Sequence, residues 1–149
     1  MELTTFRFEA PTSPDLLDRS LRGELAAAST YEQAQDHVEG SKLHSILEKN
    51  RESHATRAVA LAQMVRRKGQ KPSQEAGAWG AFTLLVERGA SFVGEDALLQ
   101  VLHEGEMMLT ATYETRAKDL DEASAADFRR HVLDPQRECQ RRLAEVLPS

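Results

Sequence analysis

The sequence predicts an all-α protein, a four-helix bundle made of two helical hairpins joined by one long connection. Three observations predict it. Four stretches carry apolar residues at helical spacing and are bounded by glycines or capping residues. A ten-residue motif in the first stretch returns in the third, and a nine-residue segment of the second returns in the fourth. Two copies of a hairpin that each leave an apolar face uncovered are expected to pack against one another.

The first hairpin is expected to consist of helices over 13–39 and 41–68. A serine, a proline and an acid open the first helix, a combination typical of helix N-termini. Gly40 ends this helix, and Ser41 can cap the next one. Basic residues fill the last turn of the second helix, where the helix dipole favours them, and Gly69 follows. The short join makes the two helices antiparallel neighbours.

The second hairpin is expected to consist of helices over 95–121 and 124–147. The segment 69–94 before it contains several glycines and reads as a long crossover that carries a short extra helix over 78–88. Pro135 lies inside the last helix, where it removes one backbone donor and is expected to kink or interrupt it.

The repeated motif places a glutamate and a tyrosine seven residues apart. Glu24 and Tyr31 recur as Glu106 and Tyr113, 82 positions later. Seven residues are about two helical turns, so each glutamate shares a face with its tyrosine. That face is otherwise apolar, and a carboxylate is costly to bury there unless a cation or hydrogen bonds meet it.

These motifs resemble those of the ferritin-like superfamily. The Glu-x6-Tyr spacing is similar to that of rubrerythrin and bacterioferritin, in which those glutamates bind iron. His54 with the hydrophobic run after it, and the segment 67–72, resemble the end of the second helix in the same superfamily. The chain more closely resembles a bacterial family of ferritin-like domains of unknown function, through its Gly-Glu motif, the glycines in 77–80 and a polar last helix. The likeness covers 16–147 and implies a ferritin-like bundle that forms oligomers, with a dimer expected.

The resemblance also raises the question of a metal site. A di-iron bundle takes one glutamate from each of two helices and a Glu-x-x-His motif from each of the other two. Here Arg51 and Arg137 stand at the positions of the two motif glutamates, and Gln140 replaces one histidine. Only His54 and the two repeated glutamates remain of six ligands.

Three interpretations follow. In the first there is no cofactor, and each arginine faces one buried glutamate while the tyrosines add hydroxyl donors. This polar core would consist of Glu24, Glu106, Arg51, Arg137, Tyr31, Tyr113 and Gln140. In the second, iron or another divalent metal binds Glu24, Glu106 and His54. In the third, a shift of one residue in the helical registry turns Glu52 or Glu138 inward.

The expected function depends on which of these three interpretations of the central residues holds. A metal-free core favours a non-enzymatic structural, stress-associated or interaction protein, and this is our main expectation. A partial metal site favours a redox protein that oxidises or stores iron or handles peroxide. A small-ligand site among the central polar residues is a weaker third hypothesis.

Length and composition further limit the kinds of protein that this chain can be. The 149 residues fit one domain over 1–149, with 1–12 as a flexible N-terminal arm. The net charge of −5, without a basic stripe, argues against nucleic acid as a partner. No apolar stretch is long enough to span a membrane. The only cysteine, Cys139, allows no internal disulfide. It is expected to be a small buried residue. A cytoplasmic protein is expected.

Overall fold

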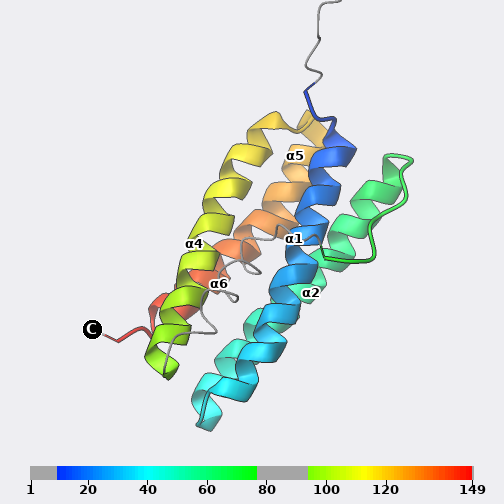
Figure 1. Cartoon of the computed structure of the whole chain (residues 1–149). Helices are drawn as coiled ribbons and strands as arrows, with labels where there is room; N and C mark the ends of the chain where they lie inside the picture. Colours follow the sequence, from blue (N-terminus) through cyan, green and yellow to red (C-terminus); the bar gives the residue numbers. More distant parts are fainter. Residues whose placement is uncertain (1–9, 77–93, 149) are drawn as a thin grey trace, which may run out of the picture.

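The described part of the chain, residues 10–76 and 94–148 of a computed structural model, is an all-α bundle of four packed helices (Figure 1). The predicted all-α bundle is therefore confirmed for these residues. The elements in chain order are α1 (Ser13–Ala34), the short 3-10 turn η1 (Gln35–His37), α2 (Ser41–Arg67), α4 (Glu95–Asp119), and a last helix formed by α5 (Glu122–Phe128), the π segment η2 (Arg129–Leu133) and α6 (Asp134–Ala144).

Helix α1 is capped by Thr12 rather than by Ser13. The Thr12 hydroxyl accepts the Asp15 N–H, and the Asp15 carboxylate accepts the Thr12 N–H, so the two residues form a capping box. The helix ends earlier than predicted, at Ala34, and the chain tightens into the 3-10 turn. It then reverses direction through Gly40, whose φ of 95° favours glycine.

Helix α2 ends within one residue of the prediction. Gly69, with a φ of 84°, donates its N–H to the Arg66 carbonyl, and Gln70 donates to the Val65 carbonyl. These two bonds form a Schellman motif, which satisfies carbonyls that the last turn leaves without helical partners.

The two hairpins run side by side. Within each, the two helices are antiparallel, and α2 ends at the opposite end of the bundle from the start of α4 (Figure 1). The predicted short helix at 78–88 lies outside the described residues, as does most of the N-terminal arm. None of the described helices is long and apolar enough to cross a membrane.

The last helix begins and continues differently from the prediction. Asp121, not Ser124, caps it, by accepting the Ser124 N–H at 2.9 Å. Its α-helical hydrogen bonding is interrupted about two turns later, where Asp134 donates its N–H to the Arg129 carbonyl five residues back. The wider π turn lies just before Pro135, which lacks an N–H and would crowd an α-helical turn. The expected interruption at Pro135 is thus confirmed as a π segment.

The core is apolar at both ends and polar in the middle. Its fully or almost fully buried apolar side chains include Leu17, Leu21, Leu47, Leu61, Val65, Leu99, Leu102, Phe128, Val132 and Leu143. Between them lie ionisable side chains from all four helices, and Glu24, His54 and Glu106 are each 0% exposed. The bundle therefore holds a charged cluster at its centre.

Candidate functional site

The two copies of the repeated motif pair with each other across the bundle. The Tyr31 hydroxyl on α1 donates to Glu106 Oε1 on α4 at 2.6 Å, and the Tyr113 hydroxyl on α4 donates to Glu24 Oε1 on α1 at 2.5 Å. The tyrosine of each motif thus donates a hydrogen bond to the glutamate of the other motif. All four side chains are 0% exposed, so these bonds lie entirely inside the core.

His54 on α2 joins the two glutamates. Its Nδ1 lies 2.6 Å from Glu24 Oε2, and its Nε2 lies 2.7 Å from Glu106 Oε1. The imidazole also stacks on the Tyr31 ring, with centroids 5.4 Å apart. A histidine whose two nitrogens both face carboxylate oxygens is well placed to carry a positive charge.

Arg57 brings a second buried cation to the cluster, from one turn further along α2. Its Nη1 lies 3.2 Å from Glu24 Oε1 and also donates to the side-chain carbonyl of Gln136. Its Nη2 lies 2.9 Å from His54 Nδ1 and 3.3 Å from the Cys139 sulfur. The guanidinium is 1% exposed, so Glu24 and the groups around it replace its water shell.

Helix α6 closes the cluster with neutral side chains. Gln136 donates to a carboxylate oxygen of Glu106 at 2.5 Å, and Cys139 lies beside Arg57. Asn50 on α2 donates to the Tyr31 hydroxyl and accepts from Arg142 at 2.5 Å. No buried side-chain nitrogen or oxygen of the described residues lacks a hydrogen-bond partner.

The charges of the cluster depend on one another. Burial, the largest influence, and Arg57 both lower the pKa of His54, but the two glutamates outweigh them and raise it above its ordinary value. Burial alone would raise the pKa of Glu106, but His54 and Arg57 lower it overall. With both glutamates ionised and both cations charged, the cluster is neutral. Burial raises the pKa of Cys139 to about 11, which keeps its thiol protonated.

The prediction that Arg51 and Arg137 face the buried glutamates is wrong. Arg51 pairs with Glu48 on its own helix, where about a third of its side chain is exposed. Arg137 is half exposed and contacts Glu114 and Asp134 at the surface. Gln140, also predicted for the polar core, is only partly buried and makes none of the contacts described above.

The other predicted core residues do come together. Glu24, Glu106, Tyr31 and Tyr113 form the crossed pairs, and His54 joins them. The alternative registry, with Glu52 or Glu138 inward, is wrong because both are exposed. The helices are instead turned so that the residues before the two arginines, Asn50 and Gln136, face inward.

Sequence reasoning missed Arg57 altogether. A signal for it was present, because Asn50, His54 and Arg57 follow one another at spacings of four and three, which places them on one face of a helix. Cys139 was expected to be a small buried residue, and it is 0% exposed.

The residues present do not fit a di-iron centre. Such a centre needs four carboxylates and two histidines directed at a metal pair. The described cluster offers two carboxylates and one histidine, and its inward positions on α2 and α6 are filled by Asn50, Arg57, Gln136 and Cys139. Arg57 already balances Glu24, and its fixed charge opposes a pair of cations beside it.

Searches against protein-family models, curated proteins and solved structures find no match to this chain.

Proposed function

We propose that this protein is a non-enzymatic structural or interaction protein, a ferritin-like bundle in which a di-iron centre is replaced by a buried ion cluster. The observation that carries the proposal is the Arg57–Glu24 ion pair at 3.2 Å in the middle of the core. A guanidinium at this position supplies the positive charge that iron supplies in a di-iron bundle, without redox chemistry.

The hydrogen bonds of the cluster support the same proposal. Catalytic groups usually have some donor or acceptor directed at a substrate, whereas the polar atoms of this cluster are directed at each other. The reactive candidate, Cys139, is buried, and its raised pKa makes it a poor nucleophile. The homo-oligomer expected from the sequence belongs to this proposal and predicts a dimer mass by light scattering.

A redox protein that uses iron is the second candidate. It is favoured by the convergence of Glu24 and Glu106 on His54, which are three ligands of types that iron accepts. This candidate requires Arg57 to leave Glu24 before a metal pair could enter.

Aerobic addition of Fe(II) to the purified protein separates the two candidates. The proposal predicts fewer than two irons per chain and a rate of Fe(II) oxidation equal to that of buffer. The Glu24→Ala variant should not change that rate. Two irons per chain, with oxidation that is lost in Glu24→Ala, would establish the redox candidate instead.

A further inference from the structure

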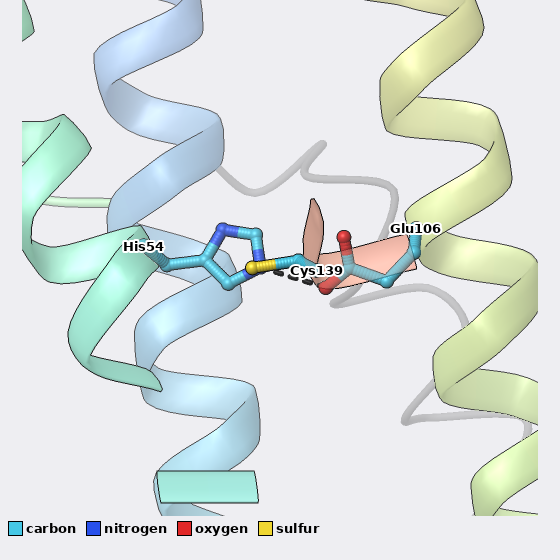
Figure 2. Close-up of side chains that lie close together, drawn as sticks. All are labelled: His54, Glu106 and Cys139. Atoms are coloured by element: carbon cyan, nitrogen blue, oxygen red, sulfur yellow. Dashed lines mark hydrogen bonds and ion pairs between the residues drawn. The ribbon is translucent and has the colours of Figure 1, made fainter. Parts of the chain in front are cut away.

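The ion cluster contains a second set of convergent groups. One ligand atom each from His54, Glu106 and Cys139 lie within 4.8 Å of one another, and all three residues are buried. Figure 2 shows His54 and Glu106 pointing toward each other from α2 and α4, with Cys139 between them from α6. Three helices therefore bring a nitrogen, an oxygen and a sulfur to within 4.8 Å of one another.

We propose that His54, Glu106 and Cys139 form a mononuclear site for one late first-row divalent cation, such as Zn²⁺. This inference rests on the proposed function in that the interior holds no iron pair. Imidazole nitrogen and thiolate sulfur are ligands that Zn²⁺ and its neighbours prefer, whereas Mg²⁺ and Ca²⁺ prefer oxygen alone.

The distance between the nitrogen and oxygen ligand atoms is close to what such a site needs, and the sulfur lies within 4.8 Å of both. With bonds of about 2.0 Å to nitrogen and oxygen, two ligand atoms of a tetrahedral site lie roughly 3.3 Å apart. His54 Nε2 and Glu106 Oε1 are now 2.7 Å apart and share a hydrogen bond. To admit a cation, these two atoms must move apart by well under an ångström, which side-chain rotation can provide.

The groups behind the ligands favour the same site. A metal-binding histidine usually holds its second ring nitrogen against a carboxylate, and Glu24 Oε2 lies 2.6 Å from His54 Nδ1. Tyr31 donates to the Glu106 carboxylate, and Arg57 donates to the Cys139 sulfur, which stabilises a thiolate. Glu24 is thus a positioning residue for the site rather than a ligand.

The charge remains balanced when the cation binds. Metal coordination replaces the proton on His54 Nε2 and the proton on the Cys139 thiol, and both protons pass to solvent. The dication then faces the Glu106 carboxylate and the new thiolate, while Glu24 and Arg57 still neutralise one another. Such neutrality is what a buried site requires.

Cobalt(II) is the probe that tests this site, because a Co²⁺–thiolate bond gives a charge-transfer absorption that oxygen and nitrogen ligands do not give. The chain has one cysteine, so that band can report only on Cys139. Metal-free full-length protein should bind one Co²⁺ with this band. Cys139→Ser should lose it, and Zn²⁺ should displace the cobalt.

Two further variants identify the remaining roles. Glu24→Gln should keep the band while weakening Co²⁺ affinity by about 10–100-fold, as expected for an orienting partner outside the ligand set. His103→Gln is the matched control, because His103 lies one turn before Glu106 on α4 and is only partly buried. It should bind Co²⁺ as the wild type does.

The site is buried, so the titration is repeated on protein refolded from denaturant with Co²⁺ present. Absence of the charge-transfer band under both conditions would overturn the proposal, as would loss of binding in His103→Gln. Neither result depends on Fe(II) oxidation, so the cobalt site can fail while the proposed function stands, and the reverse also holds.

Discussion

Arg57 contributes to the fold through charge rather than through packing alone. Its guanidinium lies within 3.2 Å of Glu24, and both side chains are almost completely withdrawn from water. Ionised groups in such a position are stable only as a set, because each one compensates the desolvation of another. Removal of one cation therefore leaves a carboxylate without its partner in the core.

We expect Arg57→Met to lower the free energy of unfolding by about 3–5 kcal/mol, since it leaves a buried charge uncompensated. Arg51→Met is the matched control on the same helix. Its partly exposed, solvent-screened pair with Glu48 should contribute little, so Arg51→Met should leave the free energy of unfolding almost unchanged. Urea denaturation followed by circular dichroism measures both values, and equal losses would contradict the assignment of Arg57 to the cluster.

His54 makes stability depend on pH. Its pKa is raised in the folded protein above the ordinary value of 6.5, because Glu106 and Glu24 outweigh burial and Arg57. A raised folded pKa means that the stabilisation is fully present below pH 6.5 and is lost as the pH rises through the folded pKa. The pKa of Glu106 is lowered in the folded protein, so the stabilisation that this carboxylate contributes is lost as the pH falls through its folded pKa.

We therefore expect the free energy of unfolding, measured with a chelator present, to decrease as the pH rises above 6.5. His54→Gln should lack that decrease. Tyr31 and Tyr113 have pKa values well above 10, and that of Cys139 is about 11, so the comparison is made below about pH 8, where these neighbours are neutral in both the folded and the unfolded protein. A profile that is unchanged in His54→Gln would refute this account.

The choice between the two arginines shows where sequence reasoning ends. Arg51 and Arg57 each lie three residues from His54, about 60° to either side of it around the helix. Spacing alone cannot tell which flank faces α6. The structure turns α2 so that Arg57 meets Gln136 and Cys139, and this rotation is set by the packing of all four helices rather than by local sequence.

At the scale of elements, two glycines in the described helices have opposite roles. Gly23 lies inside α1, and a Cβ atom added there would meet no atom within 4 Å. Gly69 ends α2 with a φ of 84°, a conformation that other residues adopt only with strain. The same substitution should therefore have opposite effects at the two positions.

Gly23→Ala should stabilise the protein by about 0.5–1 kcal/mol, because alanine loses less backbone entropy in a helix. Gly69→Ala should destabilise it by about 1–2 kcal/mol, the cost of a left-handed conformation for a residue with a Cβ. Thermal unfolding of both variants checks the two signs. A gain in melting temperature for Gly69→Ala would mean that the Schellman motif is not maintained.

The elements themselves were largely predictable. Periodicity and glycines located four helices, and the end of α2 was predicted within one residue. The early end of α1 and the cap at Asp121 were missed, because Ala34 and Ser124 do not differ locally from residues that continue or start a helix. Helix termini depend on which backbone groups find tertiary partners, and a single sequence does not contain that information.

At the scale of the whole molecule, the cluster ties the two hairpins into one unit. Glu24 of the first hairpin accepts a hydrogen bond from Tyr113 of the second. Glu106 of the second hairpin is hydrogen-bonded to Tyr31 and His54 of the first. Each carboxylate also has partners in its own hairpin, but its tyrosine donor always comes from the other one. The hairpins should consequently unfold together.

The two tyrosines provide a probe for this, since the chain has one in each hairpin. We expect the native ring signals of Tyr31 and Tyr113, followed by NMR of tyrosine-labelled protein, to disappear at the same urea concentration. Tyr31→Phe assigns the two signals. Two midpoints that differ beyond error would show that the hairpins unfold independently.

The crossed tyrosine–glutamate pairs also bear on the ancestry of the chain. In a homodimer with a twofold axis, a contact from residue i of one copy to residue j of the other is necessarily repeated in reverse. The crossed pairs have this form within a single polypeptide, as expected if a gene for one hairpin was duplicated and fused. A symmetric pair of hairpins would have to place identical residues on both sides of the glutamates. Fusion would remove that constraint, so that one half could keep His54 and Arg57 while the other acquired Gln140 and Leu143 at the corresponding positions.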